Sequence, residues 1–287
     1  MASVMEEPGV FGPDDIPGLL WFYDMHGYAI LRGLLDPARL ALIESECVDA
    51  QERVVTGELG SRHGSTVFLD DSILDDGATA DAFANYVEYV NEVSPAVESV
   101  VTDPVVTTVM RELLGPDCWL RAHEQFGVVY QDARPGKESG YARIGWHSDW
   151  QASPSLDVWP STAFTIHIDG TSPSNGFLRV VPGSHLWATP APHRNVNGAR
   201  VPATARAAGG RTDRTPPFEM PLRFEKVRGE VAVYAEPGDI LLHDAYLWHS
   251  AARATDDTER RRHVRGGYFG GTRQPAGVEE FIKNAAR

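Results

Sequence analysis

The sequence is poor in cysteine and in long apolar runs, and each shortage excludes a class of protein. Its two cysteines, Cys47 and Cys118, are too few for a disulfide framework or a zinc finger and are typical of buried free thiols in a reducing compartment. No apolar run reaches the roughly 18 to 20 residues of a membrane-spanning helix. The opening MASVMEEPGVFGPDD has acidic residues where a signal peptide has basic ones. We therefore expect a cytoplasmic protein without a membrane partner.

Positive charge is also scarce, with 26 Lys and Arg against 40 Asp and Glu and a formal net charge of −14. Nucleic acid is repelled by such a charge, so we expect a small-molecule substrate instead. Hydrophobic residues nevertheless make up 42% of the chain, the usual share for a globular protein. Because β-rich folds of 287 residues are common as one unit, we expect a single domain, 1–287, whose oligomeric state the sequence leaves open.

The part before residue 119 has the signals of helices. Asp or Ser followed closely by Pro is typical of a helix start, and this pattern occurs at Asp15, Asp36, Ser94 and Asp103. Gly27 ends the first helix, and GYAILRGLL (27–35) then has the β-branched and aromatic pattern of a strand. Residues 61–81 are acidic and rich in Gly and Ser, which predicts a loop. We expect residues 1–118 to be mostly helical.

From Trp119 the hydrophobic pattern alternates with a period of two, which is typical of strands. Seven short segments separated by Pro- and Gly-containing turns predict a mainly β fold, a sandwich or jelly roll, over residues 119–273. Residues 187–228 interrupt it with Pro, Ala, Gly and Arg and no clear period, which favours a lid-like insertion. Residues 274–287 form a C-terminal tail.

His147 and Asp149 are the first candidate metal ligands. They stand two positions apart in IGWHSDWQ (144–151), so in a strand both side chains point to one face. His249 in YLWHSAARA is a third candidate. Two imidazoles and a carboxylate on one side of a metal leave the opposite side open, as in non-haem Fe(II) oxygenases. An ordinary polar strand and a zinc hydrolase remain alternatives.

Four phrases resemble, in order, the phytanoyl-CoA dioxygenase family of Fe(II)/2-oxoglutarate-dependent oxygenases. They are FYDMHGYAILRGLLDPARL, WHSD, SNGFLRVVPGSH and GDILLHDAYLWHSA, and the resemblance covers about Phe22 to Phe269. It implies a double-stranded β-helix (jelly-roll, cupin-like) core with N-terminal helices packed on one sheet. It also implies Fe(II) bound by His147, Asp149 and His249, with 2-oxoglutarate and O₂ as cosubstrates.

The resemblance further implies an arginine for the 2-oxoglutarate carboxylate, about eleven residues after the last histidine. That spacing indicates Arg260, and the planar guanidinium suits a carboxylate because it pairs with both oxygens. Arg261 and Arg262 follow directly, so the register leaves the choice among the three open. In a strand Arg260 and Arg262 would share a face and Arg261 would point away.

Other cosubstrate contacts in the family come from strands on either side of His-x-Asp. Gln125 and Gln131 share one strand face with Gly127 and Val129, and Thr165 or Thr162 offers a rival contact. The segment QDARPG (131–136) lacks a lysine that the family often has there, which puts the contact made by that lysine in doubt.

Aromatic residues flank the candidate metal strand and suggest a wall for a flat substrate, with core packing as the alternative: Trp146, Trp150 and Trp159. We expect three further histidines to have no role as ligands: His167, His185 and His243. The resemblance implies oxidation of an unactivated C–H bond, by hydroxylation, ring closure, epimerisation or desaturation. Asp149 argues against halogenation, because related halogenases have a small residue there.

By analogy the substrate is a bacterial secondary metabolite such as a polyketide, acted on in antibiotic biosynthesis. An acyl-CoA hydroxylase of the same family is the alternative, and a non-catalytic metal- or ligand-binding β-sandwich is the alternative of another class.

Overall fold

The computed structural model describes residues 7–64, 67–70, 81–123, 127–133, 144–149, 161–187, 193–196, 199–202, 225–252, 254–256 and 259–270. Its helices are α1 (Ile16–His26), α2 (Pro37–Val55), α3 (Pro95–Val101) and α4 (Pro104–Leu114), with 3-10 turns at Val90–Glu92 and Ser184–Leu186. Among these described helices, none combines the length and the apolar character needed to cross a membrane.

The four α-helices begin where the sequence predicted. In each, the side chain just before the helix accepts a hydrogen bond from a backbone N–H of the first turn, at 2.7 to 3.1 Å: Asp15, Asp36, Ser94 and Asp103. A proline follows within two positions in every case, where its missing N–H costs nothing. Helix α1 ends at Gly27, whose φ of 82° is left-handed and favours glycine. Local chemistry therefore sets these helix boundaries.

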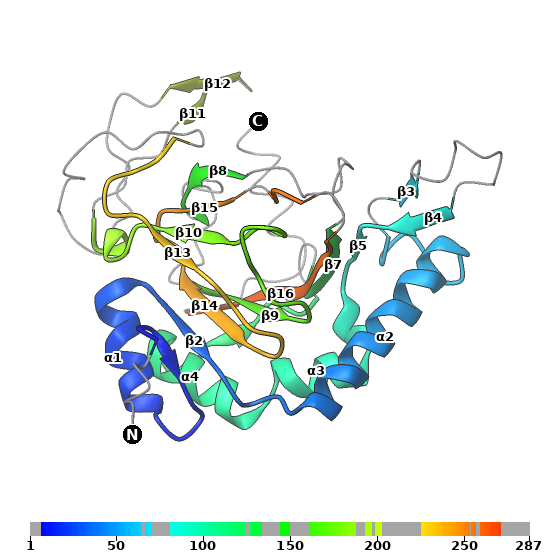
Figure 1. Cartoon of the computed structure of the whole chain (residues 1–287), viewed down its shortest axis with the longest axis horizontal. Coiled ribbons are helices and arrows are strands. Elements are labelled where there is room, and N and C mark those ends of the chain that lie inside the picture. The colour runs from blue at the N-terminus through cyan, green and yellow to red at the C-terminus, as the bar shows by residue number, and fades with distance from the viewer. Residues whose placement is uncertain are drawn as a thin grey trace.

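The larger sheet has eight strands and supports the helices (Figure 1). Its order is β1 (Val10–Phe11), β2 (Tyr28–Leu31), β14 (Ile240–Asp244), β9 (Ser161–His167), β16 (Arg261–Phe269), β7 (Val129–Ala133) and β5 (Tyr86–Val87), with β6 (Trp119–Leu120) also paired to β16. Apart from the parallel pair β1–β2, the neighbours are antiparallel. This sheet contains most of the strand residues that pack against the helices.

The smaller sheet has the order β13 (Val231–Val233), β10 (Leu178–Val180), β15 (His249–Ala251) and β8 (Ile144–His147). From β7 to β16 the chain passes between the two sheets: β7, β9, β14 and β16 belong to the larger sheet, and β8, β10, β13 and β15 to the smaller. This alternation is that of a double-stranded β-helix. The predicted jelly-roll core with helices on one sheet is confirmed.

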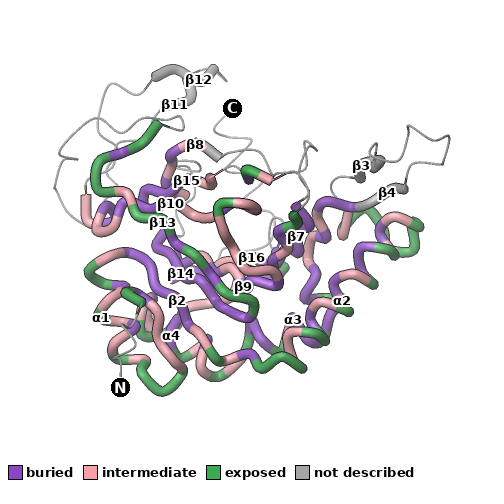
Figure 2. The backbone as a smooth tube through the Cα atoms, viewed as in Figure 1, coloured by how far each residue is buried: buried purple, intermediate pink, exposed green. Residues whose placement is uncertain are grey.

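The main core lies between the helices and the larger sheet. Ile43 and Cys47 of α2 and Val97 of α3 pack in one cluster with Phe164 of β9 and Val264 of β16. Strands β2 and β14 are buried at every residue, as the purple tube in Figure 2 shows. Of the two cysteines, both free, Cys47 is buried and Cys118 is half-buried. The opposite face of the sheet is thus left to face the smaller sheet.

The strands depart from the hydrophobic pattern in three places. Residues 239–251, one of the seven segments predicted as strands after Trp119, form β14 and β15 in different sheets, because a corner at Asp244 hydrogen-bonds the backbone N–H groups of Tyr246 and Leu247. Within the loop predicted at 61–81, strand β3 (Val67–Asp70) pairs with β4 (Asp81–Ala84). Within 187–228, β11 (His193–Val196) pairs with β12 (Ala199–Pro202). Most of that insertion and the whole tail 274–287 lie outside the described residues.

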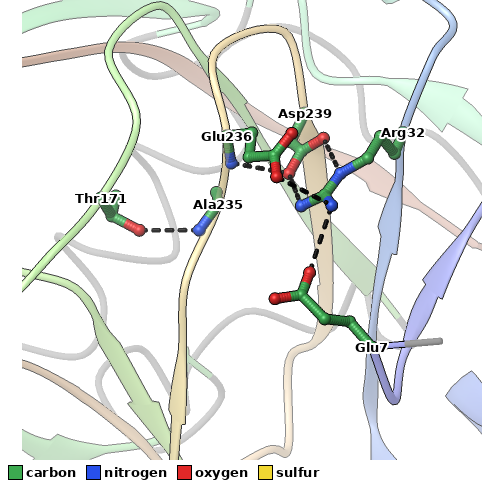
Figure 3. Close-up of polar contacts among 6 residues, drawn as sticks. All are labelled: Glu7, Arg32, Thr171, Ala235, Glu236 and Asp239. Carbon is green, nitrogen blue, oxygen red and sulfur yellow. Dashed lines mark hydrogen bonds and ion pairs between the residues drawn. The ribbon is translucent and has the colours of Figure 1, made fainter. Parts of the chain in front are cut away.

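An ion-pair network fixes the start of β14 (Figure 3). The guanidinium of Arg32, just after β2, donates to both carboxylate oxygens of Asp239 at 2.9 and 2.8 Å and also pairs with Glu7 and Glu236. Asp239 additionally accepts the backbone N–H of Glu236 at 2.7 Å, closing the turn EPGD. Because Asp239 is almost fully buried, this pairing compensates a charge that water cannot reach.

Candidate metal centre

The three candidate ligands converge on the smaller sheet. His147 ends β8 and His249 begins β15, and the two residues are direct partners across the antiparallel pair, so their side chains share a face. Asp149 follows His147 by two positions. One donor atom from each of these side chains lies within 4.8 Å of the others. Residues far apart in the sequence thus come together, as the strand pattern predicts.

The distances are consistent with one ion between three donors. Oδ1 of Asp149 lies 3.8 Å from Nε2 of His147 and 3.6 Å from Nε2 of His249. The two imidazole rings have centroids 4.2 Å apart. Two nitrogen donors and one carboxylate form the ligand set that holds non-haem Fe(II) with open positions. The residues present therefore fit this metal.

Both ligand histidines are oriented by their own strands. Nδ1 of His147 lies 2.8 Å from the carbonyl oxygen of Gly145, and Nδ1 of His249 lies 2.9 Å from that of Leu247. A carbonyl can only accept, so the proton resides on Nδ1 in each ring. The lone pair of Nε2 is then free for a metal, and the ring cannot rotate without losing a hydrogen bond.

The electrostatics of the site favour metal-binding protonation states. Burial by itself raises the pKa of the Asp149 carboxyl, but the hydrogen bond with His243 and the charges of His249, His243 and His147 outweigh it and hold that pKa well below its usual range. Burial, followed by the charge of His147, lowers the pKa of His249 to about 3. Asp149 is thus ionised and His249 neutral near neutral pH, as ligands must be.

A fourth histidine, His243 of β14, touches this centre. Its Nε2 lies 3.3 Å from Oδ2 of Asp149, and its ring centroid is 4.6 Å from that of His249. Sequence reasoning gave His243 no role, because it lies in the other sheet and the corner after β14 hides its relation to His249. One signal was present in the sequence: His243 is two residues from Leu241, so the two side chains share a strand face, and Leu242 points to the opposite face.

The inward face of the larger sheet extends the site with polar side chains. Gln131 of β7, His263 of β16 and His167 of β9 are direct partners across adjacent strands and therefore share one face. Thr165 lies on that face as well, two residues before His167. Gln131 and Thr165, two of the candidate cosubstrate contacts, therefore point into the space between the two sheets. Gln125 lies outside the described residues.

The three consecutive arginines are separated by the structure. Arg260 is exposed and precedes β16. Arg262 points toward the helices, where it donates to Asp169 at 2.9 and 2.8 Å and to Glu44 of α2 at 2.6 Å. Arg261 is buried, at 8% exposure, on the same face as His263. Of the three, Arg261 faces the interior, whereas the family spacing indicates the exposed Arg260.

Arg261 lies beside two neutral imidazoles. Burial and then the charge of Arg261 lower the pKa of His167 to about 3, and the same two causes lower the pKa of His263 well below its usual value. The two rings have centroids 6.2 Å apart. Among the described residues Nδ1 of His263 has no hydrogen-bond partner, whereas the ring of His167 lies beside the backbone of Asp169. A cation flanked by neutral imidazoles is a suitable place for a carboxylate.

The segment SNGFLRVVPGSH (174–185) contacts residues next to the candidate ligands and next to Arg261. Nδ2 of Asn175 donates to the carbonyl oxygen of Arg260 at 3.2 Å and so holds the start of β16. Gly176, with φ of 86°, lies so close to Arg261 that an added Cβ would meet its Nη1 at 2.7 Å. This end of the phrase therefore positions the arginine.

The other end of the phrase positions the last histidine. Oγ of Ser184 accepts the backbone N–H of Trp248 at 2.9 Å, directly before His249. His185 is fully buried, and its Nε2 lies 2.9 Å from the carbonyl oxygen of Asp24, which ties the turn to α1. His185 is a structural residue, as expected.

Trp146 faces away from the candidate ligands. It lies on the opposite face of β8 from His147 and packs with Val181, Val227 and Trp248. Its Nε1 donates to the carbonyl oxygen of Glu225 at 2.8 Å. Trp146 is therefore a packing residue, which corrects its assignment to a substrate wall. Two other tryptophans proposed for that wall lie outside the described residues: Trp150 and Trp159.

Comparison with known proteins agrees with this geometry. Residues 23–263 match the phytanoyl-CoA dioxygenase family. An ectoine dioxygenase of Nocardia farcinica is 29% identical over 184 residues, which cover 60% of this chain and 53% of that protein. The match thus spans about half the length of that curated relative.

Two solved structures share the fold. The epimerase SnoN, in complex with Fe³⁺, alpha ketoglutarate and nogalamycin RO, has a TM-score of 0.60 at 21% identity, covering 94% of this chain and 90% of its own. The carbocyclase SnoK from nogalamycin biosynthesis has a TM-score of 0.58 at 18% identity, covering 92% and 88%. The two structures show the shared fold, and the family match over most of its length shows that the chain belongs to the phytanoyl-CoA dioxygenase family.

Proposed function

We propose that this protein oxidises an unactivated C–H bond of a small molecule, using Fe(II), 2-oxoglutarate and O₂. The observation that carries the proposal is the meeting of His147, Asp149 and His249, with one donor atom from each within 4.8 Å of the others. A zinc hydrolase needs similar ligands, but family membership and the buried Arg261 on the inward face of the larger sheet favour the oxygenase. A non-catalytic β-sandwich has no need of either feature.

Each of the three side chains of the centre would supply one donor atom to the metal. His147 and His249 would hold Fe(II) through Nε2 and Asp149 through a carboxylate oxygen. When bound, the iron supplies the O₂-dependent redox chemistry that couples decarboxylation of 2-oxoglutarate to attack on the C–H bond. The sheets place the three donors in advance, and burial of His249 excludes water from one side.

Arg261 is our candidate for the distal carboxylate of 2-oxoglutarate. It is the arginine of the three that combines burial with an inward position, and Nδ1 of His263 beside it has no partner among the described residues. Gln131 and Thr165 lie on the same face and are candidates for further contacts with the cosubstrate. An ionised guanidinium binds a carboxylate through paired, charge-assisted hydrogen bonds.

For the substrate we propose a secondary metabolite such as a polyketide. The support is that SnoN, which shares the fold, was solved with a nogalamycin compound and that SnoK comes from nogalamycin biosynthesis. Hydroxylation, epimerisation and ring closure share the same kind of first step, which is removal of a hydrogen atom from the substrate carbon that is attacked. The carbon attacked and the outcome are for a substrate screen to decide.

The test begins with anaerobic addition of Fe(II) and then 2-oxoglutarate to the apoprotein. We expect a weak visible charge-transfer band in wild type that is absent in His147→Ala and Asp149→Ala. Candidate polyketides, ectoine and acyl-CoA esters are then screened by succinate release under air. A folded wild type without the band, or activity that persists without O₂, would overturn the oxygenase assignment and favour a hydrolase or a binding protein.

A further inference from the structure

The two oxygens of Asp149 face different partners. Oδ1 lies near both ligand nitrogens, at 3.8 Å from Nε2 of His147 and 3.6 Å from Nε2 of His249. Oδ2 lies 3.3 Å from Nε2 of His243, which comes from the opposite sheet. The carboxylate is thus held between the two sheets, with one oxygen on the side of the metal donors and the other on the side of β14.

The surroundings of His243 determine which of its nitrogens carries the proton. The ring is largely buried, at 8% exposure, and its Nδ1 has no hydrogen-bond partner among the described residues. With the proton on Nε2, the ring donates to the carboxylate. With the proton on Nδ1, a buried donor would be unsatisfied and the Nε2 lone pair would face a negatively charged oxygen. Since an unmade buried hydrogen bond is costly, the Nε2–H form is favoured.

We propose that His243 is a positioning residue that engages Oδ2 of Asp149 and thereby leaves Oδ1 alone for the metal. The inference rests on the proposed function. A carboxylate free to rotate can present both oxygens to one ion, and the second would occupy a position that the bidentate cosubstrate and O₂ require. Outer partners of metal ligands commonly hold such orientations, and their loss weakens metal binding by about 10- to 100-fold.

The test uses Co(II) alone as the probe, with binding measured by calorimetry and by its visible spectrum. His243→Phe keeps the ring shape and removes the N–H, whereas His243→Gln retains an amide N–H at a similar reach. We expect Co(II) affinity to fall about 10- to 100-fold in His243→Phe, with a changed spectrum, and to recover to within a few-fold of wild type in His243→Gln.

His63→Phe is the matched control, because it makes the same change at a half-buried histidine whose Nδ1 contacts the carbonyl oxygen of Glu88. It should leave Co(II) affinity and spectrum unchanged. The melting temperature of apo His243→Phe should fall modestly, since Oδ2 of Asp149 loses the hydrogen bond from Nε2, so Co(II) binding is the deciding readout. A fall in melting temperature with unaltered Co(II) binding would indicate a purely structural role and overturn the proposal.

Two other results would also overturn it. Wild-type Co(II) affinity in His243→Phe would show that Asp149 needs no support, and failure of His243→Gln to restore binding would indicate that the imidazole is itself a ligand. The proposed function fails separately: if wild type binds neither Co(II) nor Fe(II), the centre is no metal site. If wild type binds and Asp149→Ala does not, the centre stands whatever His243 does.

Discussion

Arg261 and Arg262, adjacent in β16, point to opposite faces of the larger sheet. Arg262 faces the helices and pairs with Asp169 and Glu44, which raises its pKa chiefly through the hydrogen bond with Asp169. Arg261 faces the interior, beside His167 and His263. The two guanidiniums carry the same charge, but strand alternation directs one to a structural ion pair and the other to the proposed cosubstrate site.

This difference predicts distinct effects of two neighbouring substitutions. We expect Arg261→Met to raise the dissociation constant of 2-oxoglutarate about 10- to 100-fold, because a hydrogen-bonded charge contributes about 1.5 to 3 kcal/mol. Arg260→Met, the same change at an exposed position, should have little effect. Anaerobic titration of the Fe(II) chelate band measures both. The reverse result, weak binding in Arg260→Met alone, would restore the register that the family spacing favoured.

At the scale of elements, two turns fix the points at which β14 and β16 begin, and so help the strands to position the side chains of the candidate site. The turn EPGD is closed by Asp239 and tied to the end of β2 by Arg32, so β14 starts at a fixed point and carries His243 inward. The turn that contains Asn175 and Gly176 does the same for the start of β16. These short connections therefore determine which side chains reach the interior.

Gly176 allows a direct test of this supporting role. In Gly176→Ala the new Cβ would meet the Ala252 carbonyl oxygen and Nη1 of Arg261, each at 2.7 Å. We expect weaker 2-oxoglutarate binding, by several-fold, because the arginine must move. Gly57→Ala is the control, since its φ of 77° is similarly left-handed but no atom lies within 4 Å of the added Cβ.

Both alanine variants should lose about 1 to 2 kcal/mol of folding free energy from the backbone conformation alone. Gly176→Ala should be the less stable of the two, because its Cβ also meets the Ala252 carbonyl oxygen at 2.7 Å. A change in 2-oxoglutarate affinity in Gly176→Ala only, with both variants folded at the assay temperature, would support the positioning role. Unchanged affinity in both variants would show that Arg261 is held by other contacts.

The sequence predicted those features that depend on local chemistry or on alternation within one strand. Helix starts at Asp36 and Ser94 follow from capping, and the pairing of His147 with Asp149 follows from the two-residue period. What it missed is how the strands are arranged relative to one another. The corner after Asp244 takes the chain into the other sheet and hides the contact of His243 with Asp149. The inward position of Arg261 follows from the pairing of β16 with β7 and β9.

On the scale of the whole molecule, the jelly roll buries histidines that must remain neutral. His167 and His263 are both nearly inaccessible, and burial and the charge of Arg261 depress their pKa values. In the folded protein these two imidazoles therefore stay neutral at pH values below about 6.5, at which they are protonated in the unfolded chain. The contribution of the two neutral histidines to the free energy of unfolding should be fully present above that pH and should be lost as the pH falls from about 6.5 toward 3.

Urea unfolding of the apoprotein at about pH 8 and pH 5 measures this loss, which can reach about 1.4 kcal/mol per pH unit for each histidine. Acid also reduces the self-repulsion of a chain with net charge −14, an opposing effect common to all variants. We expect His167→Phe to show a shallower pH dependence than wild type. Identical slopes in the two proteins would contradict the buried neutral state of His167.

The alternation of strands between sheets also affects when the protein can acquire its metal during synthesis. His147 and Asp149 leave the ribosome roughly 5 to 20 seconds before His249 at ordinary rates of elongation. Until then β8 lacks its partner β15, and the carboxylate lacks the strand that carries His243. A nascent chain therefore exposes two ligands without a site, and iron can be loaded only once translation has passed the final turn of the roll.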